Sequence, residues 1–492
     1  MLEERLVTVN ETTGRPGAPA TGRHLAEPGP EPAQPDDLVT RLLGAACYLH
    51  DDIADFAHSS LLFPSRRALS PNWEVDVVAL ARHASRAREL RATRDRWLNL
   101  ALWSIGAALI GSFVLLVAGA LNLFELVLVV MFLIFWAYVI AVWTVYTQLR
   151  AARRAAIGVV LDPRADPPPP PASLAAEEAL HDLNHCNAVL YRADGAPFVG
   201  SGVKLDNWQI TIDISRRTGP GSEPVTGADL QAALLELLPG KVSPRPSAQH
   251  RLYVRGGASA LGVELYRIGP VERDLAEALH FRRPVTVVPS AHLQQYYDRR
   301  DESARVYTCF QQSALGGQVV VSLFVRAHVA NQTLFVEGQV YALRPLHPEL
   351  YEVRSLAAGG SAELQELGPV ALSTATALLL NAPSAMMKNA RTARQDAANA
   401  AEADTEIANR RDVDFGAVKS VREQVTNFDL GEHFAAADEE LYYQVFVRRT
   451  MECIDLFLSS RGVDTTEFAG QSAEIISQTT TNARTVYGAA SS

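Results

Sequence analysis

The sequence predicts an α+β protein in which a transmembrane helical hairpin precedes a mostly antiparallel mixed cytosolic domain and a helical C-terminal extension. Three observations predict this fold class. Two uncharged apolar runs cover residues 97–121 and 126–146. Short β-type runs such as WQITIDI and VVVSLFVRAHV recur between residues 175 and 360. Amphipathic helical patterns dominate from residue 361 onward.

Both apolar runs are long enough to cross a bilayer, whose hydrocarbon core of roughly 30 Å needs about 20 helical residues. Residues 122–125 leave room only for a tight turn, so we expect a two-helix hairpin over 97–146. Neither run has a polar face, which disfavours a buried hairpin of a soluble protein. Aromatic rings prefer the membrane–water interface, and four of them are expected there: Trp97, Trp103, Trp143 and Tyr146.

Arginines predict the orientation of the hairpin. The turn between the runs contains Glu125 and no Lys or Arg, whereas the outer flanks carry Arg82, Arg86, Arg88, Arg91, Arg94, Arg96, Arg150, Arg153 and Arg154. Because positive charge stays on the cytoplasmic side, we expect a two-span protein of the cell membrane with both termini in the cytoplasm. The same arginines could contact anionic lipid headgroups, although topology alone accounts for them.

Small residues recur at a spacing of four in the first span, as Ala107 with Gly111 and Ala108 with Ser112. This spacing predicts close packing of the two spans and also permits a homo-oligomer.

A third uncharged stretch, residues 367–387, is less apolar and contains Pro369, Asn381 and Pro383. As a third span it would carry its basic flank to the outside, against the charge rule. We therefore expect a core helix or a membrane-surface segment.

The remaining boundaries follow from composition. Residues 1–36 are rich in Pro and Gly and are expected to be disordered, and residues 37–96 form a helical cytosolic segment. Residues 147–174 are a basic and Pro-rich linker, in which the run at 166–171 is a stiff spacer. The α+β cytosolic domain covers 175–360, the helical extension covers 361–470, and residues 471–492 form a mobile tail.

Composition also excludes some functions. The chain of 492 residues has a formal net charge of −10, which argues against a nucleic-acid partner. Its four cysteines are widely separated, as expected for reduced thiols in the cytosol. No apolar run opens the chain, so we expect no cleavable signal peptide.

The stretch APFVGSGVKLDNWQITIDIS, residues 196–215, raises the question of a phosphate loop or a protease barrel. A phosphate cradle needs a helix after the glycines, and a strand is predicted instead. A serine-protease triad needs a histidine after the second strand, and none is present. We interpret the glycines as a turn that adopts positive φ, with Trp208 pinning the sheet.

The motif HDLNH places His181 and His185 four residues apart, as in zinc-binding helices. Zinc proteases carry Glu where this chain has Asp182, and no further ligand can be named. We therefore expect a helix-end histidine pair, with no metal and no cofactor.

A wider resemblance rests on four stretches of the sequence: GAACYLHDDIADFAHSSLL, PFVGSGVKLDNW, LFVEGQVYALRPLHPELYEVRSL and LYYQVFVRRTMECIDLFLSSRGVDTTEF. The chain resembles a family of uncharacterised actinobacterial membrane proteins that pair two spans with a cytosolic α/β domain and a helical tail. The resemblance implies this architecture and implies no activity, substrate or catalytic residue.

The leading functional hypothesis is non-enzymatic. We expect a membrane-anchored, cytoplasm-facing scaffold that recruits an unidentified cytosolic protein or a large assembly, such as a phage-tail-like contractile injection particle, to the inner membrane face. The alternative is a membrane-perturbing effector in stress, immunity or cell death, triggered through its cytosolic domain. An enzyme acting on a membrane-proximal substrate is the third and least favoured hypothesis.

Overall fold

The computed structural model describes residues 38–62, 67–119, 122–161, 174–217, 224–256, 284–297, 303–355, 368–378, 416–429 and 432–488, with single residues 365, 384, 391, 394, 398 and 414. The expectations for residues 1–36 and for the Pro run at 166–171 lie outside these residues.

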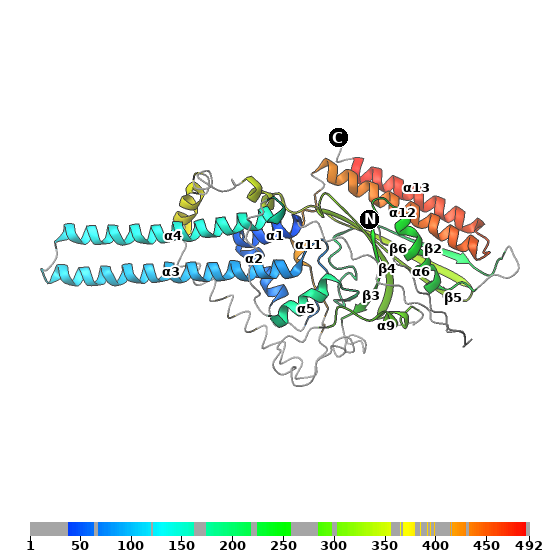
Figure 1. Ribbon diagram of the computed structural model, residues 1–492, viewed down its shortest axis with the longest axis horizontal. Helices are drawn as coiled ribbons and strands as arrows, with labels where there is room; N and C mark the ends of the chain where they lie inside the picture. Colours follow the sequence, from blue (N-terminus) through cyan, green and yellow to red (C-terminus); the bar gives the residue numbers. More distant parts are fainter. Residues whose placement is uncertain are drawn as a thin grey trace, which may run out of the picture. The chain divides into compact units, whose positions relative to one another are not determined.

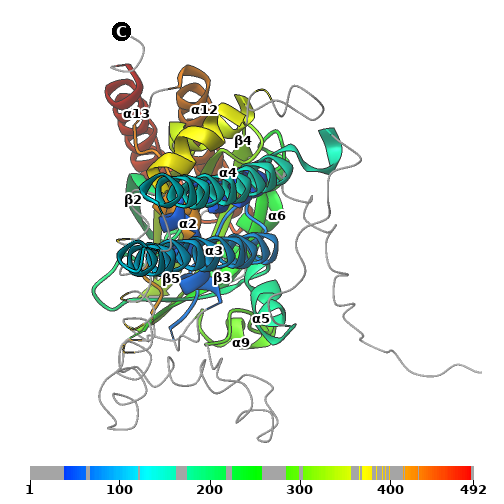
Figure 2. The same cartoon turned by 90° about the vertical axis from the view of Figure 1, so that its left-hand side faces the viewer.

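Two long helices run side by side (Figures 1 and 2): α3 (Val77–Val117) and α4 (Leu123–Leu161). Both are long and apolar enough to cross a membrane, so the predicted hairpin is confirmed as a pair of candidate spans. The Asp76 carboxylate caps α3 by accepting from the backbone N–H groups of Val78 at 2.9 Å and Ala79 at 3.3 Å. The 41 residues of α3 extend over about 60 Å, roughly twice a bilayer core.

Only part of each long helix is therefore available to lipid. The first part of α3 and the last part of α4 pack with α1 (Leu38–Leu49) and α2 (Asp51–Leu61). We call this group of helices, comprising residues 38–61, 77–96 and 147–156, the membrane-proximal body. Its core contains Leu42, Leu43 and Leu80, each essentially inaccessible to solvent.

The boundary predicted at residue 147 needs correction. No proline or glycine interrupts the chain between Tyr146 and Ala156, so α4 continues, and Ala152 is buried against the membrane-proximal body. The basic half of the predicted linker is therefore part of α4.

Beyond α5 (Leu174–Asn184), the described residues form a sheet of six strands in the order β1-β3-β4-β5-β6-β2. The strands are β1 (Ala188–Tyr191), β2 (Val203–Asp213), β3 (Ser247–Arg255), β4 (Ala304–Ala314), β5 (Val319–Ala330) and β6 (Thr333–Leu343). β1 pairs with β3 in parallel and the other pairs are antiparallel, as expected for a mostly antiparallel mixed sheet. Asn331 and Gln332 both have positive φ and form the two-residue turn between β5 and β6.

Helices α6 (Gly227–Leu237), α12 (His433–Ser460) and α13 (Thr466–Gly488) lie over one face of the sheet (Figure 1). The alternating residues Ile210, Ile212, Leu323 and Val336 point into this core, which Phe446 of α12 shares. Trp208 is buried in the same core, and its indole lies over the α-carbon of Gly338, its register partner on β6. Trp208 therefore contacts β6 across its register pair, as a side chain that holds the two strands together would.

The opposite face carries an aromatic cluster. Phe198 stacks on Phe324 with ring centroids 4.2 Å apart, and Tyr253, Tyr307 and Tyr341 surround it. The described chain also contains the 3-10 helices η1 (Leu238–Gly240) and η2 (Pro348–Ser355), the short α-helices α9 (Ser290–Gln294) and α11 (Val421–Gln424), and a helical segment over residues 368–378.

The predicted division at residues 360 and 471 needs correction. The predicted C-terminal helices are present as α12 and α13, but they share one core with the sheet, so no domain boundary separates them from it. Residues 471–488, predicted as a mobile tail, are helix α13, in which Ile475, Ala483 and Tyr487 are buried. Small polar residues on the outer side of α13 hide this apolar face in the sequence. Gly462, with φ 66°, lies just after α12, and the N–H of Val463 donates back to the Leu458 carbonyl at 3.1 Å, which closes the end of the helix.

Candidate membrane interface

An apolar belt surrounds the distal parts of α3 and α4. Large side chains that are about half exposed or more follow both helices between Trp97 and Trp143: Leu100, Trp103, Ile110, Phe113, Val114, Val117, Phe124, Val127, Leu128, Met131, Phe132, Phe135 and Trp136 are among them. A soluble protein does not leave so large a continuous apolar surface in water. In a hydrocarbon environment the side chains of the belt do not contact water, so the free-energy cost of exposing them to water is avoided.

The predicted interfacial aromatics mark one end of the belt. Trp97 and Trp143 are 52% and 66% exposed at the points where the helices leave the membrane-proximal body. Tyr146 is half-buried beside Trp143, with ring centroids 6.3 Å apart. Trp103 follows Trp97 by six residues, a rise of about 9 Å, so it lies further into the belt.

The four predicted packing residues divide between two sides of α3. Ser112 is buried and Ala108 is half-buried. Ala107 and Gly111 are exposed, and a Cβ added at Gly111 would meet no atom within 4 Å. The pair Ala107 and Gly111 is therefore not part of the contact between the two helices of this chain.

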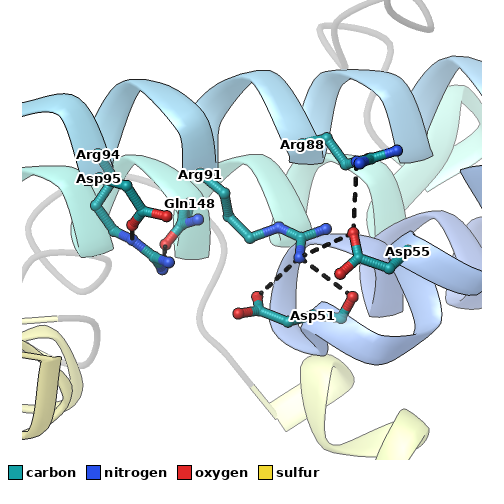
Figure 3. A network of polar contacts seen from close by, with 7 residues as sticks. All are labelled: Asp51, Asp55, Arg88, Arg91, Arg94, Asp95 and Gln148. Carbon is teal, nitrogen blue, oxygen red and sulfur yellow. Dashed lines mark hydrogen bonds and ion pairs between the residues drawn. The ribbon is translucent and has the colours of Figure 1, made fainter. Parts of the chain in front are cut away.

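An ion-pair network fastens α3 to α2 at the base of the belt (Figure 3). The Arg91 guanidinium lies 3.4 Å from the Asp51 carboxylate and 3.5 Å from that of Asp55, and it donates to the Asp51 carbonyl at 3.1 Å. Arg88 lies 3.4 Å from Asp55 and also contacts the His58 ring. One turn of α2 thus receives two arginines from α3.

Arg94 and Arg82 extend these contacts. Arg94 donates to Asp95 at 3.0 Å and, across the hairpin, to the Gln148 side chain of α4 at 3.3 Å. Arg82 pairs with Glu177 of α5 through two hydrogen bonds of 2.7 Å. The arginines that predict topology therefore also hold α2, α4 and α5 against α3.

The expectation that all these arginines face lipid needs correction. Arg91, Arg94 and Arg153 are buried within the membrane-proximal body, because the helices around them supply the packing and polar groups that an interface would otherwise supply. Arg86, Arg96, Arg150 and Arg154 are exposed. Those four are the arginines of the set that headgroups can reach.

Two half-buried histidines in this region favour the neutral form. Burial, together with Arg88 and Arg91, lowers the pKa of His58 to about 4. Burial also lowers the pKa of His83 to about 4, where the Tyr48 hydroxyl lies 3.1 Å from its Nδ1. The imidazoles of His58 and His83 are therefore neutral at neutral pH.

The glycine turn at 200–202 is confirmed as a turn. Gly200 and Gly202 have φ of 86° and 82°, and strand β2 follows at Val203. A Cβ at Gly202 would lie 2.3 Å from the Ala342 carbonyl oxygen. The Gly200 N–H donates to the Glu423 carboxylate at 3.1 Å, so a carboxylate of the same chain faces the amide that a phosphate would need.

His181 and His185 lie at the end of α5, exposed, with ring centroids 5.5 Å apart. Within the described residues, no group of three His, Cys, Asp or Glu side chains could hold a metal ion.

Comparison of the chain with known protein families identifies the domain that contains most of the sheet and the C-terminal helices. The model of the AbeC-like domain matches residues 207–489, from β2 to the end of α13. This span exceeds half of the chain. The chain belongs to the AbeC-like domain family. The boundaries of the match agree with the shared core, because the AbeC-like domain includes both the sheet from β2 onward and the helices α12 and α13.

Comparison with curated proteins found no match, and comparison with solved structures found none either.

Proposed function

We propose that this AbeC-like protein is a membrane-anchored adaptor. In this proposal it recruits a protein partner or a large cytosolic assembly, such as a phage-tail-like contractile injection particle, to the inner membrane face. The actinobacterial origin that the sequence resemblance suggests is part of the same proposal.

The observation that carries the proposal is the core shared by the anchor and the AbeC-like domain. Leu346, Leu350 and Val421 of the domain are buried in one cluster with Leu42 and Leu80 of the membrane-proximal body. A shared apolar core resists movement, unlike a flexible linker. Such a joint suits a protein that holds a partner at a fixed place on the membrane.

A buried arginine strengthens this joint. Arg422 of α11 donates to the backbone carbonyls of Gln318 at 2.7 Å and Arg344 at 2.8 Å, both in the sheet region. The backbone N–H of Arg422 donates to the Asn72 side chain at 3.2 Å, in the segment that leads into α3. Three separate parts of the chain therefore meet at one residue.

Charge favours the cytoplasmic side for the domain. Both long helices leave the apolar belt on the side of the membrane-proximal body, so the body and the AbeC-like domain lie on one side of a bilayer that the belt crosses. The arginines lie on that side, and Glu125 lies at the other end. This distribution of charge, read with the positive-inside rule, supports the proposed cytoplasmic position of the domain.

The outer side of α12 is the surface that we assign to the partner. Phe434 and Leu441 are 69% and 53% exposed and recur after seven residues, so they lie on one side of the helix. Between α12 and α13 a cavity of about 220 Å³ is lined by Leu441, Gln444, Val445, Val447, Arg448, Ile476, Thr479 and Thr480. Apolar side chains beside an arginine are a composition typical of protein interfaces.

The test is in-cell cross-linking of the full chain, followed by purification and identification of the linked proteins. One dominant partner or assembly is expected. The double variant Phe434→Glu/Leu441→Glu should lose it, whereas Val418→Glu, at another exposed apolar site, should retain it. Equal recovery with both variants contradicts the assignment of this surface. The absence of any partner specific to the full chain contradicts the adaptor function.

One observation favours a second candidate, the membrane-perturbing effector of stress, immunity or cell death. The outward position of Ala107 and Gly111 leaves small residues where a second copy could approach closely. This function predicts membrane depolarisation on overexpression, measured with a potential-sensitive dye, and its loss in Gly111→Leu. Unchanged membrane potential contradicts the effector and leaves the adaptor standing.

A further inference from the structure

Residues 368–378 form a helical segment that packs against the base of the apolar belt. Ala371 and Ala375 are fully buried, and they share a cluster with Leu98 of α3 and with Ala141 and Val145 of α4. Two small residues four positions apart permit close approach to a neighbouring helix. The segment belongs to the AbeC-like domain by sequence, yet it lies on the two long helices.

The segment reaches past the level of the interfacial tryptophan. The Tyr138 hydroxyl of α4 donates to the Leu372 carbonyl at 3.3 Å. Tyr138 precedes Trp143 by five residues, which corresponds to about 7.5 Å along the helix, toward the middle of the belt. Side chains of an α-helix also lean toward its N-terminus, which for α4 is the far end of the belt. Leu372 therefore lies on the bilayer side of Trp143.

The outward surface of the segment is uncharged and combines the apolar Val370 and Leu372 with the exposed hydroxyl-bearing residues Ser373, Thr374 and Thr376. Val370 and Leu372 are 41% and 50% exposed, and residues 368–378 contain no charge. The Ser373 hydroxyl donates to the Val370 carbonyl and the Thr376 hydroxyl donates to the Leu372 carbonyl, each at 3.0 Å. Hydroxyls satisfied in this way can enter a low-dielectric medium at reduced cost, as in membrane helices.

We infer that residues 368–378 form an interfacial helix of the AbeC-like domain that inserts Val370 and Leu372 into the acyl region of the cytoplasmic leaflet. The occupant of this exposed face is lipid, because the face continues the apolar belt of α3 and α4 at the same depth. The domain then has a lipid contact of its own beside the two candidate spans. This inference rests on the proposed membrane placement of α3 and α4.

The experiment attaches an environment-sensitive fluorophore to Leu372→Cys in the full chain. The protein is reconstituted into vesicles of phosphatidylcholine and phosphatidylglycerol. The native cysteines Cys47, Cys186, Cys309 and Cys453 are buried, so an introduced surface thiol reacts first. Val139→Cys on α4 gives the lipid reference and Phe434→Cys on α12 gives the aqueous reference, since both positions are exposed. Emission is then quenched with nitroxide-labelled lipid or with iodide in the water.

The fluorophore at position 372 should show a blue-shifted emission. Nitroxide-labelled lipid should quench it to the same extent as the fluorophore at position 139, and iodide should quench it little. Iodide quenching like that at position 434 would overturn the inference. Protection from both quenchers would also overturn it, because protein would then cover this face. Val370→Cys repeats the measurement if Leu372→Cys fails to fold. Absence of lipid quenching at position 139 would refute the membrane placement itself, whereas normal quenching there and none at 372 would refute this inference alone.

Discussion

Arg344 and Glu439 form an ion pair that joins the end of β6 to α12, with 2.9 Å between the guanidinium Nη2 and a carboxylate oxygen. The two side chains are 9% and 1% exposed, so almost no water screens them. Tyr487 of α13 donates to the same carboxylate at 2.8 Å. One buried charge pair therefore holds the last strand and both C-terminal helices of the AbeC-like domain.

The first prediction concerns this pair. Glu439→Gln leaves Arg344 buried without a counter-charge and should lower the free energy of unfolding by about 3–5 kcal/mol. The double variant Arg344→Met/Glu439→Leu removes both charges and should lose much less. Thermal or urea unfolding of the full chain in detergent measures both variants. Equal losses in the two would mean that the charges contribute no coupling.

The second prediction concerns Gly338. A Cβ at this position would lie 2.1 Å from the Trp208 indole, so Gly338→Ala should destabilise the sheet by about 1–3 kcal/mol through overpacking. Trp208→Leu in the Gly338→Ala background should recover part of that loss, because the smaller side chain makes room. A double-mutant cycle gives the coupling energy, and additivity of the two changes would contradict the contact.

The third prediction concerns the base of the candidate spans. Arg91→Met keeps the aliphatic stem and removes the contacts to Asp51 and Asp55, which are themselves partly exposed. We expect a loss of about 1–3 kcal/mol in the free energy of unfolding. Arg86→Met is the matched control, since the exposed Arg86 pairs with Glu89 on its own helix at 2.8 Å, and its effect should stay within about 0.5 kcal/mol. Similar effects of both substitutions would rule out a structural role specific to Arg91.

The fourth prediction is a loss of stability in acid. Burial lowers the pKa of His58, His83 and His250 from 6.5 to about 4, so the unfolded chain binds more protons than the folded chain between these values. Stability is therefore complete above about pH 6.5 and falls as the pH drops toward 4, by up to about 1.4 kcal/mol per pH unit for each histidine. Melting temperatures of the full chain between neutral pH and about pH 5 measure this slope. His58→Gln should reduce the slope; an unchanged slope contradicts the assignment.

The sequence predicts the parts of this fold that depend on local patterns. The uncharged runs at 97–121 and 126–146 predict the candidate spans because lipid imposes a length and a composition on a helix. The hairpin at Asn331 and the turn at Gly200 and Gly202 follow from the few residues that tolerate positive φ. Strand pairing is different, since β2 lies at the far edge beside β6 and β1 lies at the opposite edge. Such long-range pairing leaves no signal in the strands themselves.

The candidate interface was predictable in position and only partly in structure. An arginine before an apolar run looks the same in the sequence whether its side chain contacts a lipid headgroup or a carboxylate. The burial of Arg91 and Arg94 depends on how α2 and α4 pack against α3, which the sequence does not show. The apolar side of α13 consists of widely spaced residues such as Ile475 and Tyr487 among small polar ones. The position of residues 368–378 depends on a tertiary contact with Tyr138, more than two hundred residues earlier in the chain.

The central claim is that the AbeC-like domain is held at the cytoplasmic face of the membrane. Labelling of Val418→Cys with a membrane-impermeant maleimide, in intact cells and after permeabilisation, tests it most directly. Val418 of the domain is 50% exposed and lies outside the surface assigned to the partner, and the four native cysteines are buried, so the label reports the side on which the domain lies. The account predicts no labelling of the membrane fraction in intact cells and full labelling after permeabilisation. Labelling in intact cells, or recovery of the full chain outside the membrane fraction, would contradict it.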